Sequence, residues 1–239
     1  MKPKYPLIVF IGVVLFISPL QAAERLVFST FPSAGAGLVF EEVLVEAYRR
    51  IGIAVDFERL PAERALQMAD AGEFDGEAAR LAIVKNIAKN LRMIPVAVST
   101  SRVVAFSRTV DFEVTGWDSL KHYSVGILTG YKFVESKLKG TDYVSRSSYD
   151  QLIKMLVAGR IDVTLLSLLD GLKAINDQGV KGIRVLNPPL FEQPMYHFLH
   201  KKHENLTDRI TMSLKDMEKE GLTRKILDRV EDGLRGGTN

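Results

Sequence analysis

The side chains best suited to catalysis or metal binding are sparse in this sequence. The chain contains no cysteine, which excludes disulfides, thiol catalysis and cysteine-ligated metals. His197, His200 and His203 are three residues apart, but on a strand that spacing alternates between faces, and two lysines intervene. We therefore expect no metal site and no cofactor. The sequence also shows no Ser-His-Asp signature, no paired catalytic constellation and no phosphate-binding loop.

Residues 1–23 have the pattern of a removable signal peptide. A short basic head precedes an unbroken apolar run at 7–17, and small residues follow at 21–23. The run is shorter than the roughly 20 residues of a spanning helix, with an uncleaved anchor as the alternative. Cleavage fits after Ala22 or Ala23. Without a cysteine at that point the product cannot be a lipoprotein, so we expect a protein secreted into the periplasm.

The composition, with 46% hydrophobic and 26% charged residues, is that of an ordinary globular protein. Without Lys2 and Lys4, the 32 basic residues fall to 30 against 29 acidic ones. The exported part is thus nearly neutral, and no basic stripe with interleaved aromatic residues is present. These features argue against a nucleic-acid partner. The remaining length suits one large domain or two small lobes.

Strands and helices alternate in two successive units of the chain. The first unit has predicted strands at 26–30, 53–58 and 74–79 and predicted helices around 40–47 and 61–71. The second has predicted strands at 123–128, 143–145 and 161–166 and predicted helices at 131–138 and from 148 onward. Gly52 and Gly72 are expected to end the first two helices, and Ser148 with Gln151 forms a capping-box pattern. Each unit has β-α-β-α-β order, which is typical of an α/β fold with a largely parallel sheet.

A short pattern recurs at the same place in both units. Residues 68–75 and 155–162 both read Met-x-x-Ala-Gly-x-x-Asp. This pattern describes a helix end, a left-handed glycine cap and entry into a strand. Chance similarity between two common junctions is one interpretation, and two similar lobes is the other.

The connecting segments favour a hinge. Residues 103–106 resemble a strand that leaves the first unit, and residues 195–199 resemble one that returns to it. Helices are predicted at 205–219 and 222–230. A chain that crosses twice between two lobes makes a hinge with a cleft, where ligands are commonly bound. We expect a first lobe at 24–106, a second at 107–190, and a return to the first at 191–239.

Taken in order, these features resemble the bacterial extracellular solute-binding proteins of family 3, which have the type II periplasmic binding-protein fold. The resemblance extends over residues 24–230. It is carried by the motifs at 41–44, 65–76, 125–130, 156–162 and 214–222.

The resemblance implies a ligand site. In amino-acid-binding members an arginine of the first lobe holds the ligand carboxylate, which places Arg80, or less readily Arg102, in that role. The surface alternative for Arg80 is a pair with Glu77 or Asp75. Thr129 and Gly130 occupy the second-lobe turn, and Phe31 is positioned to form an apolar wall. The ammonium-binding aspartate of the family is replaced by Ser167 in this chain, with Asp170 as the substitute if the loop shifts.

The resemblance also implies a function and its alternatives. The leading hypothesis is a monomeric, non-enzymatic receptor that closes on an amino-acid-like polar or anionic metabolite. It would pass this ligand to an inner-membrane ABC permease or to a sensor. One alternative is an enzyme on the same scaffold, like the cyclohexadienyl dehydratases, with Glu63, Glu77 or Glu192 as the general acid. The other is a stand-alone sensing module.

Overall fold

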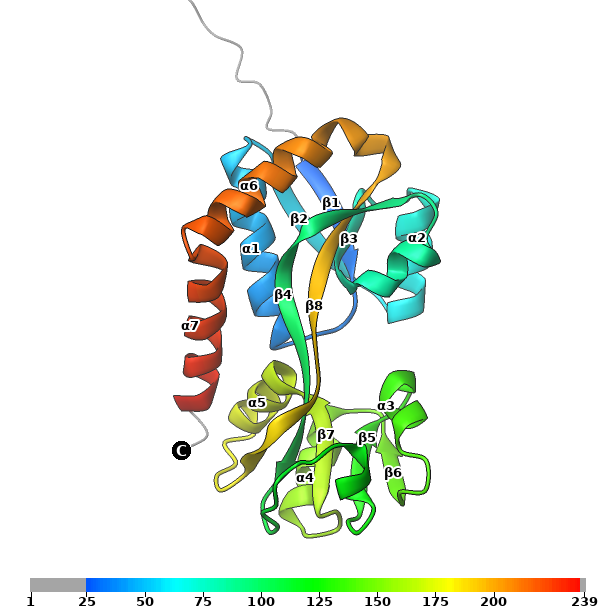
Figure 1. Ribbon diagram of the computed structural model, residues 1–239, viewed down its shortest axis with the longest axis vertical. Coiled ribbons are helices and arrows are strands. Elements are labelled where there is room, and N and C mark those ends of the chain that lie inside the picture. The colour runs from blue at the N-terminus through cyan, green and yellow to red at the C-terminus, as the bar shows by residue number, and fades with distance from the viewer. Residues whose placement is uncertain (1–24, 237–239) are drawn as a thin grey trace, which may run out of the picture.

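The structure, a computed structural model, describes residues 25–236 and contains one continuous mixed sheet (Figure 1). The strand order is β2-β1-β3-β8-β4-β7-β5-β6. The strands are β1 (Arg25–Thr30), β2 (Ala54–Arg59), β3 (Gly76–Leu81), β4 (Leu91–Ser107), β5 (Val125–Leu128), β6 (Tyr143–Arg146), β7 (Val163–Ser167) and β8 (Arg184–His200). The α-helices are α1 (Ala36–Arg50), α2 (Ala62–Ala71), α3 (Lys132–Lys137), α4 (Tyr149–Val157), α5 (Leu168–Asp177), α6 (Thr207–Lys219) and α7 (Leu222–Gly236). The expected signal peptide lies outside the described residues.

The first lobe is built around a parallel core. Strand β1 pairs in parallel with β2 and β3, as the β-α-β-α-β pattern predicts. Helix α1 buries the apolar face that the spacing from Phe40 to Ala47 predicts, and all four apolar residues on it are fully buried. Gly72 caps α2 at a φ of +83°, a conformation that suits glycine.

The second lobe repeats this plan. Strand β5 pairs in parallel with β6 and β7. Helix α4 begins where predicted, because the Ser148 side chain accepts a hydrogen bond from the backbone N–H of Gln151 at 3.3 Å. Helix α5 was not predicted from the sequence. It begins directly after β7 and is buried along most of its length.

The recurring sequence pattern is a structural repeat. Asp75 accepts a hydrogen bond from the Val27 backbone N–H at 2.8 Å, and its own N–H donates to the Val27 carbonyl at 2.9 Å. Asp162 makes the same reciprocal pair with Ser124 at 2.8 and 2.9 Å. In each lobe the aspartate therefore ties the helix-to-strand junction to the first strand of the unit. This shared geometry favours two similar lobes over chance.

Strands β4 and β8 run antiparallel through both lobes and form the two-strand hinge (Figure 1). Both strands have 17 residues and are much longer than predicted. In the first lobe β8 pairs with β3, and in the second lobe β4 pairs with β7. Because the two lobes share these strands, the lobe limits at 24–106, 107–190 and 191–239 stay a proposal.

The C-terminal helices cover one side of the molecule. Helices α6 and α7 pack on α1 of the first lobe, and α7 also contacts α5 of the second (Figure 1). Helix α7 thus runs alongside the hinge. No helix within residues 25–236 has the length and apolar character needed to cross a bilayer.

Candidate ligand-binding cleft

A cavity of about 410 Å³ lies between the lobes. It is lined by Phe31, Pro32, Ala36, Ala62, Arg80, Leu81, Ser101, Leu128, Thr129, Gly130, Tyr131, Tyr149, Ser167, Asp170 and Met195. This set includes six of the seven ligand-site candidates of the sequence analysis, all but Arg102. Most of those six lie at or just beyond the carboxyl ends of parallel strands, where ligands bind in open α/β sheets.

Arg80 forms one wall, and the first lobe holds its guanidinium in place. Its Nε donates to Glu77 Oε1 at 2.7 Å and its Nη2 to the Ala62 carbonyl at 2.6 Å. Glu77 is fully buried and also accepts from Ser29 Oγ at 2.7 Å. Burial raises the pKa of Glu77, while Arg80 and the Ser29 hydroxyl oppose that rise. Of the five guanidinium N–H donors, two are committed to the protein, which leaves donors for an acceptor in the cavity.

Phe31 forms the adjoining wall. The Arg80 guanidinium carbon lies 5.1 Å from the centre of its ring, within cation–π range. The ring also lies 6.0 Å from that of Phe40 on α1. The aromatic side chain therefore backs the arginine and presents apolar surface to the cavity.

The second-lobe turn lies opposite. Gly130 has a φ of +80°, which favours glycine at this turn. The Thr129 backbone N–H donates to the Arg146 carbonyl at 2.9 Å, and that of Gly130 to Glu135 Oε1 at 3.3 Å. The turn amides thus have partners within the lobe, and the exposed Thr129 hydroxyl is the group that it offers to a ligand.

Asp170 lies on α5 of the second lobe, but its carboxylate binds the first lobe. Its Oδ1 accepts from Ser33 Oγ at 2.9 Å and from the backbone N–H groups of Gly35 at 2.7 Å and Ala36 at 3.2 Å. These donors are at the start of α1, where a negative charge is stabilising. Ser167, the last residue of β7, makes no side-chain cap to α5. The chain therefore offers a free hydroxyl at the position where the resemblance expects an acid.

Two tyrosines that sequence reasoning missed complete the cleft. Burial, reinforced by the negative charge of Asp170, raises the pKa of Tyr131 to about 12. Burial, reinforced by the negative charge of Asp170, likewise raises the pKa of Tyr149. Both rings are therefore neutral at physiological pH. Tyr131 directly follows the predicted turn and was findable from that position, whereas nothing local marks Tyr149.

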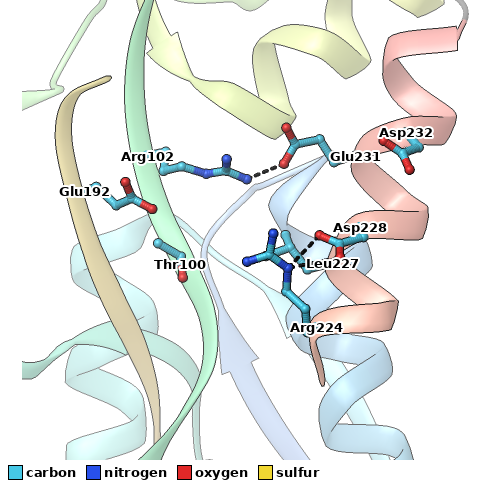
Figure 2. A pocket seen from close by; sticks show the side chains of 8 residues that line it. All are labelled: Thr100, Arg102, Glu192, Arg224, Leu227, Asp228, Glu231 and Asp232. Carbon is cyan, nitrogen blue, oxygen red and sulfur yellow. Dashed lines mark hydrogen bonds and ion pairs between the residues drawn. The ribbon is translucent and has the colours of Figure 1, made fainter. Parts of the chain in front are cut away.

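Arg102 lies in a different place. It extends from β4 toward α7 and forms an ion pair with Glu231 (Figure 2). A separate cavity of about 280 Å³ lies there, lined by Thr100, Arg102, Glu192, Arg224, Leu227, Asp228, Glu231 and Asp232. Arg102 is therefore the wrong candidate for the interlobe clamp, because β4 directs it to the outer face of the hinge.

The three histidines have separate surroundings. Fully buried His197 bonds with Tyr48 and with the backbone carbonyl of Glu77. His203 bonds with Asp75, and His200 packs beside the cap of α2. Among residues 25–236 no group of three metal-ligating side chains converges.

Comparisons with known proteins define the class of the fold. No family model matches the chain. An uncharacterised protein of Shewanella oneidensis is 26% identical over 193 residues, which cover 76% of this chain and 72% of the relative. An amino-acid ABC transporter substrate-binding protein of Streptococcus pneumoniae, solved with L-arginine, superposes with a TM-score of 0.66. It is 13% identical over 90% of this chain and 96% of its own.

A histidine kinase sensor domain similar to periplasmic binding proteins superposes with a TM-score of 0.68, at 14% identity over 87% of this chain and 96% of that domain. The chain therefore has the two-lobed α/β fold of the periplasmic binding proteins, as predicted. Of these two structural neighbours, one is a substrate-binding protein and the other a sensor domain.

Proposed function

We propose that the protein is a non-enzymatic periplasmic receptor that captures a small polar or anionic metabolite between its lobes. The observation that carries this proposal is the position of Arg80 in the interlobe cavity, anchored by buried Glu77 with N–H donors to spare. A planar guanidinium binds a carboxylate bidentately. Ligand contacts to both lobes would stabilise the closed arrangement about the β4–β8 hinge.

Polar contacts already join the lobes near the cavity. Lys132 of α3 bonds with Glu63 of α2 at 2.6 Å, and both side chains are exposed. Asp170 bonds with the start of α1. The exposed ion pair contributes little by itself, so the Asp170 hydrogen bonds and a ligand that bridges the lobes would together supply the closing free energy.

The proposed location and partners rest on the predicted signal peptide and on the fold. A cleaved product without a lipid anchor would diffuse as a monomer in the periplasm. It would deliver its ligand to an inner-membrane ABC permease or report it to a sensor. The Streptococcus pneumoniae neighbour belongs to an ABC transporter and the other neighbour to a histidine kinase, so the fold is compatible with both partners.

Binding is favoured over an enzymatic role by the positions of the three candidate acids. Glu77 is buried behind Arg80, Glu63 is exposed and paired with Lys132, and Glu192 lines the outer cavity. A cyclohexadienyl dehydratase-like reaction needs a carboxyl group in contact with the bound ligand. None of the three is among the residues that line the interlobe cavity.

Isothermal titration of the purified protein with a panel of amino and organic acids tests the proposal. We expect one or more carboxylates to bind, and Arg80→Ala to weaken that binding by about 10- to 100-fold, because a charge-assisted hydrogen bond contributes about 1.5–3 kcal/mol. The control is Arg92→Ala, an exposed arginine of the same lobe, which should bind normally. Absence of binding across the panel, or normal binding by folded Arg80→Ala, would refute the proposed receptor function.

A further inference from the structure

The charges around the interlobe cavity constrain the ligand. Of the described residues that line it, only Arg80 has a basic side chain and only Asp170 an acidic one. The other polar side chains are neutral hydroxyls, which belong to Ser101, Thr129, Tyr131, Tyr149 and Ser167. From this inventory, and resting on the proposed function, we propose that the ligand is a carboxylate with an apolar, ring-bearing body and no α-ammonium group.

Asp170 is already engaged by the first lobe through one of its carboxylate oxygens. Its Oδ1 already receives three hydrogen bonds from Ser33, Gly35 and Ala36, at 2.7–3.2 Å. The start of the 15-residue helix α1 compensates the negative charge. A ligand ammonium that drew Oδ1 away from these donors would therefore strip α1 of its cap and break a contact between the lobes.

An α-ammonium at the end of β7 would meet Ser167 instead. The hydroxyl accepts a hydrogen bond but carries no charge to offset the cation. Burying an ammonium group without a counter-ion is strongly unfavourable. The cleft should therefore discriminate against an amino acid in favour of the same skeleton without its amino group.

The walls indicate the body of the ligand. Large apolar or aromatic surfaces come from Phe31, Leu81, Leu128, Tyr131, Tyr149 and Met195. Phe31 is braced by Phe40 on one side and lies beneath the Arg80 guanidinium. A ligand whose carboxylate reaches the free N–H groups of Arg80 would place its body against these rings, which favour stacked or edge-to-face contact with another ring.

A matched pair of ligands tests the inference. Calorimetry should show 3-phenylpropanoate binding at least about tenfold more tightly than L-phenylalanine, since one unpaired charge costs at least one charge-assisted hydrogen bond. Equal or tighter binding of L-phenylalanine would overturn the inference. If neither compound binds but another panel acid does, this ligand class is wrong and the receptor stands. If nothing in the whole panel binds, the receptor fails as well.

Variants of Ser167 and Asp170 test which residue governs the preference between the two ligands. Ser167→Asp should raise the affinity for L-phenylalanine relative to 3-phenylpropanoate by about tenfold, whereas Ser136→Asp on the exposed face of α3 should leave the ratio unchanged. Asp170→Asn keeps an acceptor for the α1 amides and should change both affinities by the same factor. A selective loss of L-phenylalanine binding in folded Asp170→Asn would show that Asp170 does bind the ammonium group and would overturn the inference.

Discussion

Buried His197 should make the stability of this protein fall steeply in mild acid. Its Nδ1 lies 3.0 Å from the Glu77 carbonyl, which only accepts, so Nδ1 carries the proton. Its Nε2 must then accept from the Tyr48 hydroxyl at 2.9 Å. Protonating Nε2 would force the Tyr48 hydroxyl to turn and accept, and would bury a charge. Burial lowers the pKa of His197 to about 4, against the opposing effect of the backbone carbonyls.

The size of the stability loss follows from the linkage between protonation of His197 and folding. Between pH 6.5 and 4 the unfolded imidazole is protonated and the folded one is not, so the unfolded state binds more protons and stability falls as the pH falls. Each pKa unit corresponds to about 1.4 kcal/mol. The full contribution is then about 3 kcal/mol, of which about 2 kcal/mol is lost between pH 7 and pH 5.

Urea denaturation at half-unit pH steps measures this effect. We expect the wild type to lose about 2 kcal/mol between pH 7 and 5, and His197→Gln to start from a lower stability but lose far less. His122→Gln, at an exposed position, should keep the wild-type profile. A flat wild-type profile, or an equally steep one for His197→Gln, would refute the assigned tautomer and its protonation cost.

Three further changes have defined outcomes. Gly35→Ala would place its Cβ 2.0 Å from the Leu169 carbonyl oxygen, so we expect a loss of about 1–3 kcal/mol in urea denaturation. Gly233→Ala, in the exposed interior of α7 with no atom nearby, should instead gain about 0.5–1 kcal/mol in the same assay. Glu77→Gln should weaken carboxylate binding by about tenfold in calorimetry, because Arg80 loses its charged anchor. Unchanged affinity would mean that the backbone contact alone orients the arginine.

Local sequence signals account for most of the fold. The apolar spacing of α1 and the glycine cap of α2 are visible without tertiary information, because each feature acts within a few residues. The outer half of β8 was missed because residues 184–194 are mostly exposed, include three prolines and show no alternation. Helix α5 was missed because its buried start continues the apolar run of β7 without a boundary.

The candidate site likewise has features that the sequence predicts and features that only the folded structure shows. The positions of Arg80 and Thr129 at the cavity could be predicted because each lies at the end of a predicted strand, and the fold class brings these strand ends to one edge. The hydrogen bonds of Asp170 could not be predicted, since its partner Ser33 lies 137 residues away in the sequence. The sequence shows which acids are present, whereas only the packed lobes show which of them are already bonded.

The path of α7 along the hinge also has a practical consequence. Because this last helix contacts α1 in one lobe and α5 in the other, its end should shift whenever the lobes change their separation. A fluorescent dye near the C-terminus, paired with a second dye on the far edge of the second lobe, would therefore report ligand capture as a change in energy transfer. Such labelling would turn the protein into an optical reporter for the metabolite that it binds.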